Sequence, residues 1–161
     1  MIITPTFVIL LIIVFILVWL FTNTIDKRKW LTFLISIVVT PITYFYVLYP
    51  VVNIFSSYHH EKYFKVQTWE KIPRLRYEML NNIIDDSLLI GKSKQETKAL
   101  LGASEWYGWD DTIKANNPEK WNYNLGFKPG AFNNMQECIE LEFTNNAVKT
   151  VRQYQLEKTF E

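Results

Sequence analysis

Two long stretches of apolar residues open the chain, and they differ sharply from everything that follows. Residues 2–21 contain no charged side chain, and residues 31–55 form a second uncharged stretch. Twenty residues make an α-helix about 30 Å long, which matches the hydrocarbon core of a bilayer. The pattern therefore predicts a transmembrane helical hairpin, with Pro41 kinking the second helix without ending it.

Charged and aromatic residues gather where the two apolar stretches meet. The loop between them carries Lys27, Arg28 and Lys29, and Trp19 and Trp30 stand on either side of it. Basic side chains and indole rings favour the boundary between lipid and water, so these five residues are predicted to lie at the membrane interface. The first stretch lacks the basic start and the small-residue cleavage site of a signal peptide, and is therefore predicted to be a retained helix.

The basic loop also predicts how the chain is oriented. Such loops favour the cytoplasmic side of a membrane, which would place the C-terminal part outside the cytoplasm. The basic residues that follow the second stretch argue the other way, but they alternate with Glu61 and Glu70 and lie farther from the bilayer. We therefore expect an external or periplasmic C-terminal domain.

Helical spacing returns only after a polar, aromatic-rich connector. Residues 73–86 repeat apolar side chains every three to four positions, as one buried helix face does. Ser93 and Glu96 form a capping-box pattern that predicts a short second helix over Lys94–Leu101. The expected organisation is a hairpin over 1–55, a connector over 56–72 and a folded domain over 73–161.

Alternation with a period of two predicts an antiparallel sheet in the remainder. The candidate strands are residues 105–109, 121–125, 138–143 and 147–156. Asn145 and Asn146 suit a tight turn because asparagine tolerates positive φ, and the last strand changes phase near Val148, which indicates a β-bulge. Across that hairpin, the acidic residues of one strand are expected to face the basic residues of the other: Glu140, Glu142, Lys149 and Arg152. The predicted fold class is α+β, with two transmembrane helices followed by two helices packed on three or four antiparallel strands.

Charge and composition exclude several classes of function. Of 17 basic and 16 acidic residues, 14 and 15 lie after residue 55, so this part lacks the positive excess of a nucleic-acid-binding protein. Cys138 is the single cysteine, which excludes an intramolecular disulfide and a multi-cysteine zinc site. His59 and His60 are adjacent, so their side chains diverge and make a poor metal site; pH sensing or metal binding is the less favoured interpretation. No catalytic residue, metal or cofactor is predicted.

The segment Trp106-Tyr107-Gly108-Trp109 is the most distinctive local feature. Three large aromatic side chains either cover the edge or core of the sheet, which is the commoner outcome, or anchor a protein partner. Nearby acidic residues and a further tryptophan extend the same candidate surface, below a polar loop over residues 110–120. The candidate binding residues are Trp106, Tyr107, Trp109, Asp110, Asp111 and Trp121.

Three motifs occur in an order that resembles a known family. They are the Gly91-Lys92-Ser93 helix start with its Leu101-Gly102 end, the strand Trp121-Asn122-Tyr123, and the hairpin from Ile139 to Val148. Over residues 74–154 the chain resembles the SmpA/OmlA (BamE-like) domain, which shares its fold with β-lactamase-inhibitor proteins. The resemblance implies a non-catalytic binding module at a bacterial envelope. The chain departs from the family's lipoproteins because it has no lipid-carrying cysteine and has a two-helix anchor instead, so a role in outer-membrane barrel assembly is not expected.

These observations favour a membrane-anchored protein-binding module that acts as an accessory or assembly subunit of the bacterial cell envelope. The expected location is the inner membrane, with the domain on the periplasmic side, and the expected partners are a protein and the lipid bilayer. The alternative is an anchored inhibitor or immunity protein that neutralises a toxin or enzyme. A membrane-bound enzyme would need a pocket of convergent polar groups, and no set of residues in the sequence indicates one.

Overall fold

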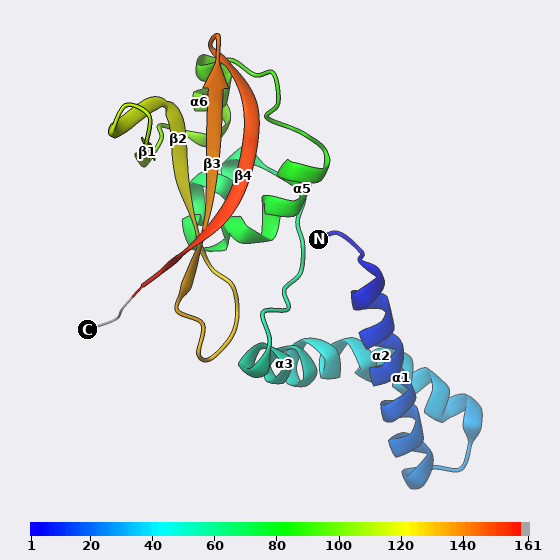
Figure 1. Ribbon diagram of the computed structural model, residues 1–161. Coiled ribbons are helices and arrows are strands. Elements are labelled where there is room, and N and C mark those ends of the chain that lie inside the picture. Colours follow the sequence, from blue (N-terminus) through cyan, green and yellow to red (C-terminus); the bar gives the residue numbers. More distant parts are fainter. Residues whose placement is uncertain (159–161) are drawn as a thin grey trace. The chain divides into compact units, whose positions relative to one another are not determined.

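The computed structural model describes residues 1–158 and divides into two compact units (Figure 1). One unit, the helical hairpin, contains Ile2–His60 together with Pro129–Ala131. The other, the α+β domain, is built from Glu61–Lys128 and residues 132–158, with Met1 assigned to it as well. The predicted α+β class, with two N-terminal apolar helices, is confirmed, and each unit is described below by itself.

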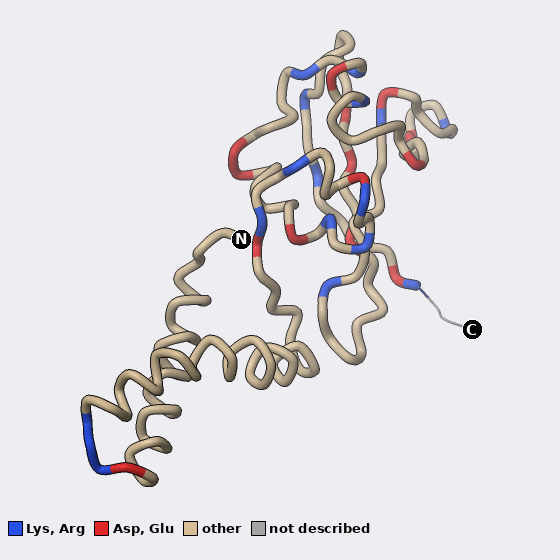
Figure 2. Tube along the Cα trace, turned by 180° about the vertical axis from the view of Figure 1, so that it is seen from behind, with Lys and Arg blue, Asp and Glu red and all other residues tan. Residues whose placement is uncertain are grey.

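Two long helices make up the helical hairpin. Helix α1 spans Pro5–Ile25, and the second long helix runs over Lys29–Phe55 as α2 (Lys29–Thr43), a π-helical segment η1 (Tyr44–Leu48) and α3 (Tyr49–Phe55). Both helices are long and apolar enough to cross a membrane. Figure 2 shows that the charged residues of this unit gather in the loop between the two helices. Most of their large apolar side chains are exposed, as expected of helices that are solvated by lipid.

Small polar side chains line the contact between α1 and α2. The hydroxyls of Thr22 and Ser36 lie 3.1 Å apart across the two helices, and the Thr32 hydroxyl donates to the side-chain oxygen of Asn23 at 2.9 Å. Thr32, Ser36 and Thr40 recur every four residues and are buried, so they bring the backbones close together. Association through small residues and interhelical hydrogen bonds is typical of helices packed in a membrane.

The π-helical segment lies between two prolines, Pro41 and Pro50. Neither proline can donate a backbone hydrogen bond, and the backbone N–H of Tyr49 reaches the carbonyl of Tyr44, five residues earlier. Both tyrosines contact His60: the Tyr44 hydroxyl lies 3.0 Å from its Nε2 atom, and the Tyr49 ring centroid lies 4.3 Å from the imidazole. Pro41 therefore changes the helix without ending it, as the sequence predicts.

Four short helical segments begin the α+β domain. They are α4 (Val66–Lys71), a 3₁₀ segment η2 (Pro73–Met79), α5 (Leu80–Asp85) and α6 (Lys94–Leu101). Both parts of the capping box at Ser93 and Glu96 are present, which confirms the predicted start of α6. The predicted connector is partly wrong, because α4 lies inside it and Trp69 is completely buried.

The sheet contains four antiparallel strands in the order β1-β2-β3-β4 (Figure 1). Their bounds are Trp106–Asp110, Ala115–Phe127, Met135–Thr144 and Ala147–Glu157. Asn145 and Asn146 have φ of 51° and 63°, and the ladder shifts register opposite Glu142, which confirms the predicted turn and bulge. The predicted loop over 110–120 is largely wrong: β2 begins at Ala115 and pairs with Asp110 to extend a hairpin.

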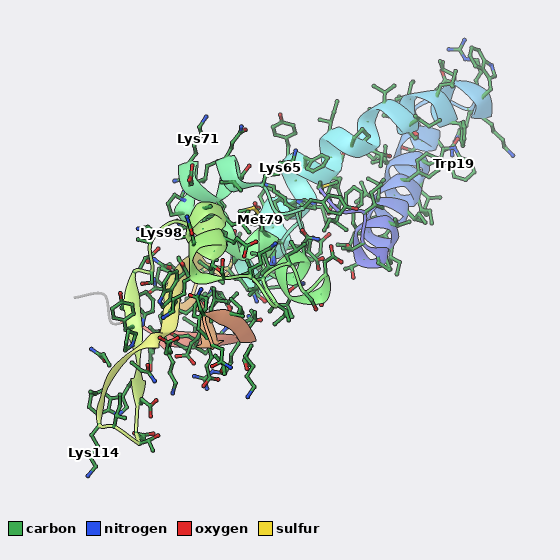
Figure 3. The ribbon with its side chains drawn as sticks, turned by 90° about the horizontal axis from the view of Figure 1, so that it is seen from above. Trp19, Lys65, Lys71, Met79, Lys98 and Lys114 are labelled. Atoms are coloured by element: carbon green, nitrogen blue, oxygen red, sulfur yellow. The ribbon has the colours of Figure 1, made fainter. Side chains whose placement is uncertain are left out.

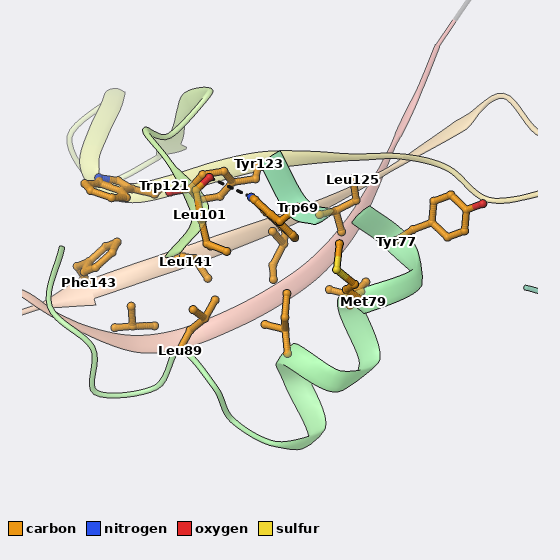
Figure 4. Packing of buried hydrophobic residues seen from close by; sticks show 14 residues of the cluster. Trp69, Tyr77, Met79, Leu89, Leu101, Trp121, Tyr123, Leu125, Leu141 and Phe143 are labelled. Carbon is orange, nitrogen blue, oxygen red and sulfur yellow. Dashed lines mark hydrogen bonds between the residues drawn. The ribbon is translucent and has the colours of Figure 1, made fainter. Parts of the chain in front are cut away.

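The core lies between the helical segments and one face of the sheet (Figure 4). Trp69 is at its centre, where its indole donates to the Leu101 carbonyl at 2.9 Å. The hydroxyl of Tyr123 donates to the Gly102 carbonyl at 3.1 Å. These two hydrogen bonds hold the C-terminus of α6 against the core. The buried cluster comprises Trp69, Tyr77, Met79, Leu80, Ile83, Leu89, Leu101, Trp121, Tyr123, Leu125, Ile139, Leu141, Phe143 and Val148.

A buried arginine joins η2 to the sheet. The Arg76 guanidinium donates to the carboxylate of Glu105 at 2.6 Å and to the carbonyl of Asn124 at 3.1 Å. It also donates to the Trp69 carbonyl at 2.9 Å and lies 4.6 Å from the centroid of that indole ring. Close by, Gly126 has φ of +89°, and any Cβ there would overlap the Arg74 carbonyl. These two residues set how closely η2 approaches β2.

Candidate binding surface

The helical segments cover one face of the sheet, and the side chains of alternate strand residues point to the other. We call this second side the open face. Its central row crosses all four strands, because Trp106 pairs with Asn122, Asn122 with Glu140, and Glu140 with Arg152. The residues that define the open face are Trp106, Gly108, Lys120, Asn122, Glu140, Arg152 and Tyr154.

Hydrogen bonds and one glycine organise the centre of the open face. The Tyr154 hydroxyl donates to the side-chain oxygen of Asn122 at 2.7 Å, and Asn122 is completely buried beneath its neighbours. Arg152 donates to the Glu140 carboxylate at 2.9 Å, and its guanidinium is 5.8 Å from the Tyr154 ring centroid. Gly108 leaves the space that the Glu140 carboxylate occupies, since a Cβ would overlap it. The centre of the face is therefore polar, and hydrogen bonds hold its side chains in place.

Three ionisable groups on this face have pKa values shifted away from their ordinary range. Burial raises the pKa of Tyr154 to about 12, and burial likewise raises the pKa of Cys138 to about 11. Cys138 is thus a neutral thiol at physiological pH and a poor nucleophile. Hydrogen bonds from the Thr112 hydroxyl and the Asn117 amide hold the pKa of Asp110 well below its usual range, so this carboxylate stays ionised. None of these three groups is poised near neutral pH for proton transfer.

A shallow depression of about 230 Å³ lies on the open face. It is smaller than the pockets that enclose small-molecule ligands, which measure roughly 300–1,000 Å³. The lining residues are Lys120, Glu140, Glu142, Thr150 and Arg152.

The β1–β2 hairpin presents aromatic side chains beside this face. Tyr107 is 46% exposed and Trp109 is 58% exposed, on the side of β1 opposite to Trp106. The Trp109 indole donates to the Asp111 carboxylate at 2.9 Å, which fixes its orientation. Figure 3 shows Lys114 at the far tip of the hairpin. An exposed phenol ring beside an exposed indole that a hydrogen bond orients suits an interface with another protein.

The structure separates the six candidate residues into four groups. Trp121 belongs to the core, where its ring centroid lies 4.8 Å from that of Phe143, so it adds no exposed surface. Trp106 lies on the open face, while Tyr107 and Trp109 are exposed on the hairpin. Asp110 and Asp111 form hydrogen bonds within the hairpin.

The sequence reasoning missed several residues of the open face. Asn122 and Tyr154 were not singled out, although their even positions in alternating strands place them opposite the core residues. The Glu140–Arg152 pair was expected across the last hairpin and is present, whereas Glu142 pairs with Thr150 because of the bulge. Among residues 1–158, no group of three or more His, Cys, Asp or Glu side chains is placed to hold a metal ion.

Comparisons with models of protein families, with curated proteins and with solved structures returned no match to this chain. The SmpA/OmlA resemblance therefore stays a prediction that rests on the order of three short motifs.

Proposed function

We propose that this protein is a membrane-anchored, non-catalytic binding module that serves as an accessory or assembly subunit at the bacterial cell envelope. The helical hairpin would hold it in the bilayer, and the α+β domain would bind a protein partner. The exposed pair Tyr107 and Trp109 on a hydrogen-bonded hairpin is the observation that carries the proposal. The open face lies on the other side of β1 from these two rings and offers a second, polar surface of mixed charge.

The charged side chains on this surface are paired with one another. Lys120 lies 3.6 Å from Asp110, and Arg152 is paired with Glu140, so the charged groups neutralise one another. The depression between them is shallow and is lined by side chains that carry both signs of charge. Interfaces gain orientation and selectivity from such paired charges more than they gain affinity.

Replacing Tyr107 and Trp109 together by alanine is expected to reduce partner recovery at least about tenfold. Hot-spot aromatics contribute about 2 kcal/mol or more each, and 1.4 kcal/mol corresponds to a factor of ten. The measurement is quantitative mass spectrometry of proteins that co-purify with the full-length chain in mild detergent. The melting temperature should change little, because both side chains are exposed.

Phe132→Ala is the matched control, because Phe132 is an aromatic residue that is 93% exposed on the β2–β3 loop. This variant should capture the partner as the unchanged chain does. If the double variant recovered as much partner as the unchanged chain, the hairpin would not be part of the interface. If Phe132→Ala lost as much partner as the double variant, the loss would not be specific to the hairpin.

We further propose that the chain lies in the bacterial inner membrane with the α+β domain on the periplasmic side. The support is the loop between the long helices, where Lys27, Arg28 and Lys29 outnumber Asp26. A cysteine that replaces the exposed Ile113 is expected to react with an impermeant maleimide in intact spheroplasts. A cysteine that replaces Lys27 should react only after permeabilisation. The native Cys138 is buried and gives little background, and the reverse labelling pattern would invert the topology.

A further inference from the structure

Strand β4 forms one edge of the sheet, and most of that edge pairs with no further strand of the described chain (Figure 1). Only its beginning is covered: the Gly91 N–H donates to the Val148 carbonyl at 2.9 Å, and the Val148 N–H donates to the Lys92 carbonyl at 2.9 Å. Within residues 1–158, no other segment pairs with β4 on this side, so Lys149–Glu157 is a free edge of nine residues.

The ladder indicates which backbone groups point outward. Lys158 donates to the Asn134 carbonyl, on the β3 side of the strand, at 2.9 Å. Backbone groups alternate in direction along a strand, so Thr150, Arg152, Tyr154 and Leu156 point to β3. The bulge at Lys149 accounts for the change of phase after Val148. The N–H and C=O groups of Val151, Gln153 and Gln155 therefore face outward, ready to pair with another strand.

The free edge is self-complementary about its centre. The antiparallel register that uses all nine residues places Gln153 opposite Gln153 of the partner subunit, as a hydrogen-bonded pair. The same register places Lys149 opposite the partner's Glu157, so opposite charges meet at both ends. It also places Arg152 beside the partner's Tyr154, which repeats the cation–π contact that these residues make within one chain.

The edge also lacks the devices that commonly block strand addition. Between Thr150 and Leu156 there is no proline, and Arg152 is the one charged residue. Charged side chains, prolines and bulges are how proteins usually protect a long edge, and here the one bulge lies at the end that Gly91 and Lys92 already cover.

We propose that two copies of this chain associate through β4, antiparallel and centred on Gln153, to form one continuous sheet across both copies. The occupant of the edge is a second copy because charge, register and outward backbone groups all match when β4 meets itself. The Tyr107 and Trp109 surface lies on β1, at the opposite edge of the sheet, so the association leaves the proposed partner surface open.

Cysteine trapping in the full-length chain tests the register. Hydrogen-bonded antiparallel pairs have Cα atoms about 5.5 Å apart, within the range that a disulfide spans. The Gln153→Cys variant is therefore expected to form a covalent dimer under mild oxidation in lipid nanodiscs or native membranes. Light scattering of the unchanged chain in detergent should give the mass of two copies.

Gln155→Cys is the matched control. Both glutamines donate to the buried Glu137 carboxylate at 2.6 Å, so each substitution removes the same kind of bond. In the proposed register two copies of residue 155 lie four positions apart along the strands, about 14 Å, which no disulfide spans. Gln155→Cys alone should stay monomeric on a denaturing gel, whereas co-expression of Gln155→Cys with Val151→Cys should give the mixed dimer.

Equal trapping of Gln153→Cys and Gln155→Cys would overturn the register. Failure of both Gln153→Cys and the mixed pair, with a monomeric mass in detergent, would overturn the association itself. A monomer that instead holds a different protein along β4 would also overturn it, because the edge would then serve a foreign strand.

Discussion

Replacing Gly126 by alanine is expected to destabilise the α+β domain by about 3 kcal/mol. The backbone at this position has φ of +89°, which is unfavourable for a residue with a side chain, and a Cβ would overlap the Arg74 carbonyl. Backbone atoms of η2 can give way only if η2 moves off the sheet. Since small domains are stable by only about 5–15 kcal/mol, the variant should unfold at clearly lower denaturant. The measurement is tryptophan fluorescence of the full-length chain in detergent during a urea titration.

Gly91→Ala separates the two contributions to this loss. Gly91 also has positive φ, +79°, but nothing lies within 4 Å of a Cβ built there. The Gly91→Ala substitution should lower the free energy of unfolding by only about 1 kcal/mol, because it adds the unfavourable backbone conformation without a steric overlap. If both variants lost the same stability, the close approach of η2 to β2 at Gly126 would have no energetic importance.

Replacing Arg76 by methionine is expected to cost about 3 kcal/mol, for a different reason. The substitution keeps much of the apolar packing on Trp69 but leaves the carbonyls of Trp69 and Asn124 without this donor and Glu105 without its cation. Only the Arg76 side of this ion pair is buried, so most of the cost comes from the two carbonyls that lose their donor. Hydrogen exchange should report the loss as faster opening of η2 and of the adjoining part of β2.

Arg152→Met provides the comparison on the open face. The Arg152 side chain is 66% exposed and pairs with Glu140, whereas the Arg76 side chain is 9% exposed. Exposed ion pairs contribute about 0–1 kcal/mol, so this variant should unfold almost as the unchanged chain does. Equal losses at the two positions would mean that burial does not set the contribution of the Arg76 network.

Much of the fold follows from local patterns, and the exceptions have physical reasons. The capping box at Ser93 and the turn at Asn145 depend on neighbouring residues, so the sequence predicts them well. Trp69 shows the limit: its indole bonds to Leu101, 32 positions later, and no local period reveals that contact. The extended hairpin over residues 110–120 was missed because its polar side chains face solvent on both sides and show no apolar alternation.

The candidate surface could be predicted only in part for a related reason. Aromatic residues that are close in sequence point to opposite sides of β1. Whether each ring is buried depends on which side chains of the other strands and helical segments lie next to it. Trp121 and Trp109 therefore have opposite environments, one in the core and one in solvent, although both sit in similar aromatic segments. The hydrogen bond between Asn122 and Tyr154 joins residues 32 positions apart in the sequence. It can form only when β2 and β4 belong to the same sheet.

The number of residues in the π-helical segment decides whether Tyr44 and Tyr49 point to the same side of the second long helix. In a regular α-helix two residues five positions apart point about 140° away from each other. Tyr44 and Tyr49 nevertheless contact the same imidazole ring, because the wider turn between the prolines absorbs one extra residue. Deleting one residue between them would turn every later side chain of the helix by about 100°. Natural variants of this segment should therefore exchange apolar residues freely while keeping its residue count fixed.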